Sequence, residues 1–138
     1  MKKLNLLAII LCATIIILEI LPFGAVLNFM TAPGDSVPYI RETYSYFSLT
    51  PFGYANFGPF LCAALSVILL VMHVLLSFVK PKKGAYSSAI VLTLLAILFS
   101  ITPLLMFGTR YFSAVGLMIS ALLTVLLAVT FHLQKKCK

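Results

Sequence analysis

The chain has 138 residues, of which 62% are hydrophobic and 9% are charged, and its formal net charge is +7 at pH 7. An average soluble domain carries about 25% charged residues, and so few polar side chains could not cover a soluble protein of this length. The composition therefore excludes an ordinary soluble domain. It predicts an all-α membrane protein, because about 20 consecutive apolar residues form a helix that crosses the bilayer.

Four apolar segments are long enough to cross a membrane, at residues 4–23, 59–79, 85–107 and 111–133. They predict that residues 1–138 form a single transmembrane domain, folded as a four-helix bundle. The first segment begins with Lys2 and Lys3, as a signal peptide does. However, its apolar run is long, contains Glu19 and has no convincing small-residue cleavage site, so we expect it to be retained as the first membrane helix.

The eight lysines fall into three clusters beside the apolar segments, at residues 2–3, 80–83 and 135–138. The charges of the other loop residues sum to zero: Asp35, Arg41, Glu42 and Arg110. Four crossings place all the lysines on one side, and the positive-inside rule then predicts that both termini are cytoplasmic. We expect the lysines to contact anionic lipid headgroups and not nucleic acid, in the plasma membrane of a bacterium.

The longest segment between predicted helices, residues 31–58, is expected on the outer side of the membrane. Pro22 and Gly24 predict a kink or an end of the first helix, and the apolar residues 25–30 would continue that helix beyond the kink. Residues 37–48 predict a short helix on the outer leaflet, although part of this stretch also alternates like a strand.

The remaining loops are short. Pro81 ends the second helix, and the turn at residues 107–110 is so tight that the third and fourth helices must be antiparallel neighbours. The dipeptide Phe-Gly occurs four times, beginning at Phe23, Phe52, Phe57 and Phe107. We expect all four copies at the outer interface, because aromatic rings favour that depth and glycine permits tight turns.

Glu19 is the residue that fits its segment least well. An unpaired charge at this depth costs about 2–3 kcal/mol or more. Asn5 and Cys12 precede Glu19 at intervals of seven, so the three share one face of the first helix. The charged candidate partner at the same end is Arg110, followed by Arg41. Two interpretations stay open: a structural salt bridge, or a binding site for a proton, a cation or a substrate.

Two other patterns concern helix packing. The second helix carries a polar stripe spaced by four, seven and four residues: Cys62, Ser66, His73 and Ser77. We expect hydrogen bonds from it to neighbouring helices, with a proton relay as the alternative. The fourth helix carries small residues at intervals of four: Gly116, Ser120, Thr124 and Ala128. This spacing lets helices approach closely, either within one chain or between copies in a homo-oligomer.

The sequence contains no catalytic motif. Its three cysteines form no C-x-x-C pair, and its two histidines have no spacing suited to a metal. We therefore expect no enzyme, no metal and no cofactor. The sequence favours a non-enzymatic membrane subunit that packs against itself or a larger partner. The alternative is a small oligomeric transporter or channel that is coupled to a proton or cation through Glu19. A sealed contact around Glu19 favours the first, and a water-accessible cavity favours the second.

Overall fold

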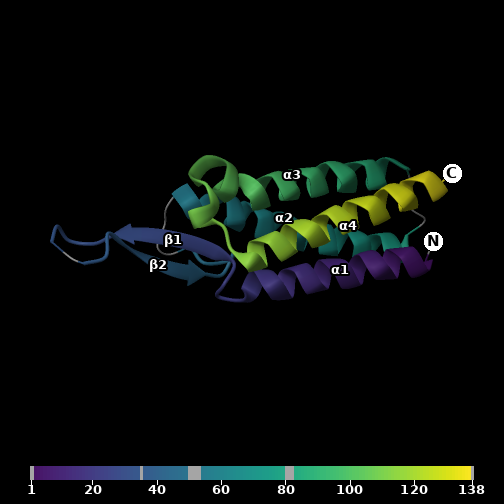
Figure 1. The fold of residues 1–138 in the computed structure, drawn as a ribbon. Coiled ribbons are helices and arrows are strands. Elements are labelled where there is room, and N and C mark those ends of the chain that lie inside the picture. The colour runs from purple at the N-terminus through teal and green to yellow at the C-terminus, as the bar shows by residue number, and fades with distance from the viewer. Residues whose placement is uncertain (1, 35, 50–53, 80–82, 138) are drawn as a thin grey trace.

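The computed structural model describes residues 2–34, 36–49, 54–79 and 83–137. Within these ranges the helices are α1 (Lys2–Ile20), α2 (Tyr54–Phe78), α3 (Lys83–Phe107) and α4 (Ala114–Lys136), with a short 3-10 helix, η1 (Thr109–Tyr111), before α4. Two strands follow α1, namely β1 (Ala25–Met30) and β2 (Tyr39–Tyr44). Figure 1 shows the helices side by side, with the strands projecting from one end of the bundle.

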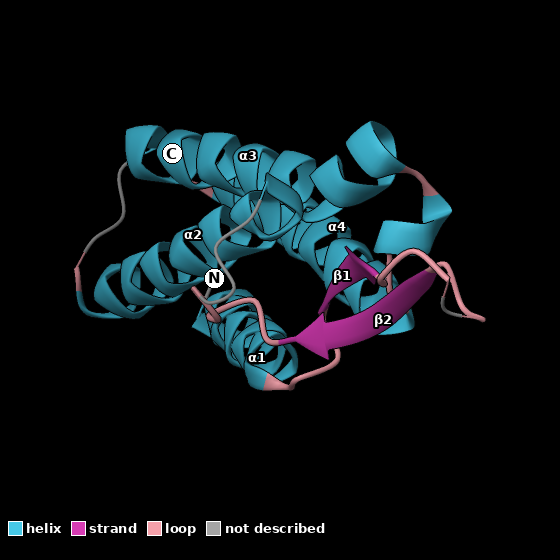
Figure 2. Cartoon of the chain, turned by 90° about the vertical axis from the view of Figure 1, so that its left-hand side faces the viewer, coloured by secondary structure: helices cyan, strands magenta, loops and turns pink. Residues whose placement is uncertain are grey.

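Each of the four helices is long and apolar enough to cross a membrane, which confirms the prediction of four membrane-length helices. The helices form a closed ring of neighbours, α1–α2–α3–α4–α1, which Figure 2 shows from the strand side. Only 28–33% of the most apolar part of each helix is buried inside the protein. Most residues of these apolar windows therefore keep some exposed surface, which is compatible with helices that face lipid.

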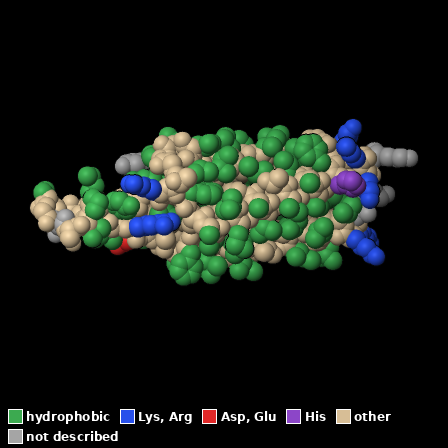
Figure 3. All heavy atoms as spheres, viewed as in Figure 1, with side chains coloured by type: hydrophobic (Ala, Val, Ile, Leu, Met, Phe, Trp, Pro, Cys, Tyr) green, Lys and Arg blue, Asp and Glu red, His purple; other side chains and the backbone are tan. Residues whose placement is uncertain are grey.

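The two ends of the bundle differ in charge. Both termini lie at one end in Figure 1, and basic side chains gather at that end in Figure 3. The described lysines belong to the start of α1, the start of α3 and the end of α4: Lys2, Lys3, Lys83, Lys135 and Lys136. We call this the lysine end, and the opposite end, where the strands project, the hairpin end. The antiparallel course of the helices thus brings together lysines that are far apart in the sequence.

The strands form an antiparallel hairpin, in which Ala25 faces Tyr44 and Met30 faces Tyr39. The predictions that residues 25–30 continue the first helix and that residues 37–48 form a short outer helix are therefore wrong. The hairpin extends along the axis of the bundle (Figure 1). Burial falls along β1 from its base to its tip, since Ala25 is 2% exposed and Met30 is 93% exposed.

Tyr46 packs the base of the hairpin onto the bundle. Its side chain is buried, and its backbone N–H donates a hydrogen bond to the carbonyl of Glu19 (2.9 Å). Two glycines leave space for it: a Cβ atom on Gly24 would lie 2.7 Å from the ring, and one on Gly116 would lie 3.1 Å from the phenol oxygen. The Ser113 hydroxyl accepts from the Gly116 N–H (2.8 Å) and donates to the Gly24 carbonyl (2.6 Å), so the start of α4 also holds this position.

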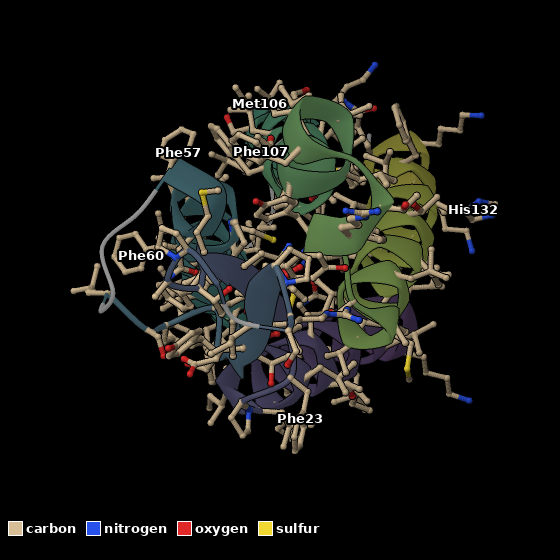
Figure 4. The ribbon with its side chains drawn as sticks, turned by 60° about the vertical axis from the view of Figure 1, so that its left-hand side comes forward. Phe23, Phe57, Phe60, Met106, Phe107 and His132 are labelled. Carbon is tan, nitrogen blue, oxygen red and sulfur yellow. The ribbon has the colours of Figure 1, made fainter. Side chains whose placement is uncertain are left out.

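Aromatic side chains lie around the outside of the bundle near the hairpin end. Figure 4 shows Phe23, Phe57 and Phe60 pointing outward from the end of α1 and the start of α2. The ring of Phe107, at the end of α3, packs against Tyr111 with 5.4 Å between centroids. Aromatic rings favour the headgroup depth, so this belt fits one boundary of the membrane. The predicted Phe52-Gly53 pair lies outside the described residues.

Candidate functional site

Three polar side chains of α1, Asn5, Cys12 and Glu19, are buried against the neighbouring helices. The face that α1 buries recurs every three or four residues and consists of Asn5, Ala8, Cys12, Ile15 and Glu19. This is the face that the intervals of seven indicate. It packs against α2, where the polar stripe divides into two pairs, one near each end of the α1–α2 contact.

The first pair surrounds Glu19. The Glu19 carboxyl oxygen Oε1 accepts hydrogen bonds from the Ser66 hydroxyl (2.8 Å) and the Cys62 thiol (3.5 Å). The second oxygen, Oε2, is buried and has no hydrogen-bond partner among the described residues. The Glu19 side chain as a whole is 0% exposed. The Glu19 carboxyl group is therefore closed off from solvent, and the groups that donate to it carry no charge.

The same region of the bundle holds further polar groups from the other two helices. The Ser100 and Ser120 hydroxyls are hydrogen-bonded across the α3–α4 contact (2.7 Å). Burial raises the pKa of the Tyr46 phenol, and its hydrogen bond with Ser100 partly opposes this shift. We call these six residues the Glu19 cluster: Glu19, Tyr46, Cys62, Ser66, Ser100 and Ser120. The cluster links all four helices to the base of the hairpin.

Arg110 does not join this cluster, so the predicted Glu19–Arg110 salt bridge is not formed. The Arg110 guanidinium instead lies over the ring of Tyr39, 5.5 Å from its centroid, on the hairpin. The second candidate, Arg41, donates to the Phe112 carbonyl (3.5 Å). Both arginines therefore tie the hairpin to the segment around η1, where their side chains are exposed. An arginine at this end avoids the desolvation cost of entering the bundle.

The second pair of the stripe binds Asn5, nearer the lysine end. The Asn5 amide nitrogen donates to the His73 carbonyl (2.9 Å) and to the Ser77 hydroxyl (2.7 Å). Its amide oxygen lies 3.1 Å from His73 Nδ1 and can only accept, so Nδ1 is the nitrogen that carries the proton. The other ring nitrogen, Nε2, is buried without a hydrogen-bond partner in the described part of the chain. We call Asn5, His73 and Ser77 the Asn5 cluster.

The stripe of small residues on α4 is split between two environments. Gly116 and Ser120 are buried within the chain, whereas Thr124 and Ala128 are exposed. The exposed half therefore faces lipid or another protein. The structure brings the first half against α3 and Tyr46, and it leaves the second half outside the intramolecular packing.

No group of three side chains suited to a metal occurs among the described residues. His73 is buried in the Asn5 cluster, whereas His132 points away from the bundle in Figure 4. On the hairpin, the Tyr44 phenol donates a hydrogen bond to Glu42, which raises the pKa of Tyr44. The polar groups of the two clusters are thus hydrogen-bonded to one another across helix contacts, apart from Glu19 Oε2 and His73 Nε2.

No protein-family model, curated protein or solved structure matches this chain. The assignment of a function therefore depends on the geometry of the hairpin and of the two polar clusters.

Two members of these clusters, Tyr46 and Ser100, and the pairing of Asn5 with His73 were not predicted from the sequence. Tyr46 lies in the segment expected on the outer surface, and nothing in its sequence context indicates a buried position. Ser100 is one of several hydroxyl residues in α3, and its distance of twenty residues from Ser120 has meaning only once the α3–α4 turn is known. Asn5 was assigned to the correct face, but its partner His73 could have been found by matching the polar positions of α1 with those of an antiparallel α2.

Proposed function

We propose that this chain is a non-enzymatic membrane subunit that binds a protein partner through the tip of its hairpin. In this proposal the lysine end faces the cytoplasm of a cell whose plasma membrane the four helices cross, and the hairpin lies on the outer side. The orientation is supported by the gathering of lysines at one end, since basic residues favour the cytoplasmic side.

The observation that carries the proposal is the apolar tip of the hairpin. A strand of six residues is about 20 Å long, so a hairpin aligned with the bundle axis carries its tip well beyond the helix ends and the aromatic belt. Large apolar side chains are nevertheless exposed there, at Phe29, Met30, Val37 and Ile40. Lipid does not cover side chains at that height, and a cluster of exposed apolar residues outside the membrane is typical of a protein contact.

The base of the hairpin supports the same proposal. An isolated two-stranded hairpin is marginally stable in water, but here Tyr46 and the stacked Arg110–Tyr39 pair hold it against the bundle. A contact surface that is ordered before binding loses less conformational entropy when the partner arrives. The Glu19 cluster then has a structural role, because it joins the helices on which the hairpin stands.

The second candidate function, transport coupled to Glu19, is supported by one observation. Glu19 Oε2 is buried and unpartnered among the described residues, which leaves one hydrogen-bonding position of the carboxyl group open. Against this, the side chain has no exposed surface, and the backbone carbonyl of Glu19 is hydrogen-bonded to the N–H of the buried Tyr46. No cation lies beside it among the described residues, and a buried unpaired carboxylate is very costly, so nothing in this surrounding holds a permanent charge ready for coupling.

The partner-binding proposal is tested by photocrosslinking in native membranes. A photoreactive amino acid is placed at Phe29 or Ile40 on the hairpin tip, and at Ile17 or Leu117 as controls on exposed helix faces. We expect a discrete protein adduct from the two tip positions only. An adduct of twice the chain mass would identify a second copy as the partner. Absence of protein adducts at both tip positions, or equal adducts at the helix controls, would refute the proposal.

The transport alternative is tested separately in liposomes that contain the purified protein. A pH gradient is imposed, and its decay is compared between the native chain and the Glu19→Gln variant. Because the Glu19 cluster is sealed, we expect both to decay like protein-free liposomes. A faster decay that disappears in Glu19→Gln would make the chain a proton-coupled transporter or channel instead.

A further inference from the structure

A groove opens between the helices at the lysine end, with a volume of about 710 Å³. Two lysines in the first turn of α1, Lys2 and Lys3, lie at its mouth. Below them, apolar side chains form the walls between α1 and α2: Leu6 and Ile9 on α1, Leu76 on α2, and Val79 directly after α2. The volume is within the range of about 300–1,000 Å³ that is usual for small-molecule sites.

The charge at this end has no counterpart in the described protein. The only acidic residues of the chain are Glu19, Asp35 and Glu42, and none of them occurs in the segments that form the lysine end. No acidic side chain within the described ranges therefore neutralises the lysines of the groove, and an anion from outside can do so. Because the groove lies at the end of membrane-length helices, anionic lipid headgroups are the anions at that depth.

We propose that this groove is a binding site for one anionic phospholipid. The lysine ammonium groups contact the phosphate, and an acyl chain lies along the apolar walls between α1 and α2. This combination distinguishes a lipid from a free phosphate ion, which would gain nothing from the apolar walls. It also distinguishes a specific site from diffuse attraction, because Lys135 and Lys136, in the last turn of α4, lie at the same end but do not line the groove.

The polar residues of the groove are already engaged inside the protein. Asn5 and Ser77 both line it, and both belong to the Asn5 cluster that joins α1 to α2. The shape of the groove therefore depends on the same hydrogen bonds that fix the spacing of the two helices. The site is at the opposite end from the hairpin, so its test is independent of the proposed partner binding.

The experiment uses delipidated protein in a neutral detergent, titrated with phosphatidylglycerol and followed by native mass spectrometry. The Lys2→Gln/Lys3→Gln double variant is compared with Lys135→Gln/Lys136→Gln, which removes the same charge from the same end. We expect the first to weaken binding of a single lipid about tenfold or more, the loss expected for two lysines near a phosphate, and the second to change it less than about twofold. Phosphatidylcholine should bind weakly, and inorganic phosphate should not displace phosphatidylglycerol.

A second pair of variants keeps every charge and tests the apolar wall. Ile9→Trp fills the groove, whereas Ile10→Trp adds the same ring at an adjacent position that does not line it. We expect the bound lipid to be lost in Ile9→Trp and retained in Ile10→Trp. Equal losses in the two lysine variants, displacement by phosphate, or full binding by Ile9→Trp would each overturn the proposal.

Discussion

Tyr46 occupies space that two glycines leave open, and this fit determines how the hairpin meets the helices. Its ring lies 2.7 Å from the position that a Cβ atom on Gly24 would take, and its hydroxyl lies 3.1 Å from the corresponding position on Gly116. Tyr46 is buried on all sides, so it cannot move away as an exposed side chain would. A single methyl group at Gly24 therefore forces a displacement of the ring or of the backbone.

We predict that Gly24→Ala destabilises the protein by about 1–3 kcal/mol, the usual cost of overpacking a filled core. The matched control is Gly84→Ala, because a Cβ atom there meets nothing within 4 Å and alanine favours a helix. Thermal unfolding in detergent, followed by circular dichroism, should show a lower Tm for the first variant only. A Gly24→Ala variant with an unchanged Tm would mean that Tyr46 is not held in this position.

Arg110 shows which part of the site could be predicted from residues alone and which could not. Its place at the end of the bundle opposite the lysines was predicted, and so was the position of Glu19 on the less lipid-like face of α1. The direction of the Arg110 side chain could not be predicted, because it depends on the backbone of the turn, where Gly108 has a φ of 83°. The arginine consequently stacks on Tyr39, which belongs to a strand that the sequence did not reveal.

At the scale of elements, the contact between α1 and α2 depends on two small polar clusters separated by apolar layers. Asn5 makes hydrogen bonds with both His73 and Ser77, and Glu19 accepts hydrogen bonds from Ser66 and Cys62. Because apolar surfaces gain little from leaving lipid, hydrogen bonds of this kind fix which faces of two membrane helices meet. The clusters thereby set the rotation and the register of α1 against α2.

We expect this contact to be measurable by a double-mutant cycle with Asn5→Ala and His73→Leu. Asn5→Ala leaves the His73 ring nitrogen Nδ1 without its partner, and His73→Leu leaves the Asn5 amide oxygen without its partner. The double variant removes both groups, so neither is left unpaired. The coupling free energy should be about 1 kcal/mol, as for other hydrogen bonds inside membrane proteins. The free energy of unfolding is measured for the native chain, the two single variants and the double variant, in mixed micelles with increasing sodium dodecyl sulfate. Strictly additive effects would contradict the contact.

The α4 stripe makes a separate prediction, because its two halves have different surroundings. Ser120→Leu should lower the stability by about 1–3 kcal/mol, since it places a large side chain against Ser100 in a filled contact. Ala128→Leu should leave the stability of the single chain unchanged, because Ala128 is exposed. Thermal unfolding compares the two. If Ala128→Leu lowers the Tm and also reduces a dimer in size-exclusion chromatography, the exposed half is an interface between copies.

The helices were predicted from the sequence and the hairpin was not, for a physical reason. A membrane helix is specified by length and apolarity, which a single sequence displays directly. The base of β1 is buried on both faces, so Ala25, Val26 and Leu27 lack the alternation that indicates a strand. Its pairing with β2 depends on contacts with α2 and η1 that no local pattern contains.

At the scale of the whole molecule, the lysines and the hairpin should lie on opposite sides of the membrane. In a background without native cysteines, we expect Met30→Cys to react with a membrane-impermeant maleimide in intact cells. Lys136→Cys should react only after the membrane is permeabilised. Both side chains are exposed, so a difference in labelling reports the side of the membrane and not burial. The reverse pattern would invert the orientation predicted by the lysines.

The long sequence separations within the two polar clusters have a consequence for synthesis. Asn5 and Glu19 emerge from the ribosome before their partners exist, since His73 follows Asn5 by 68 residues and Ser66 follows Glu19 by 47. At about 5–20 residues per second, α1 must wait for several seconds with an amide and a carboxyl group exposed on one face. Lipid is a poor environment for that face alone. We therefore expect α1 to remain beside the insertion machinery until α2 arrives, so that the two helices enter the bilayer together as a pair.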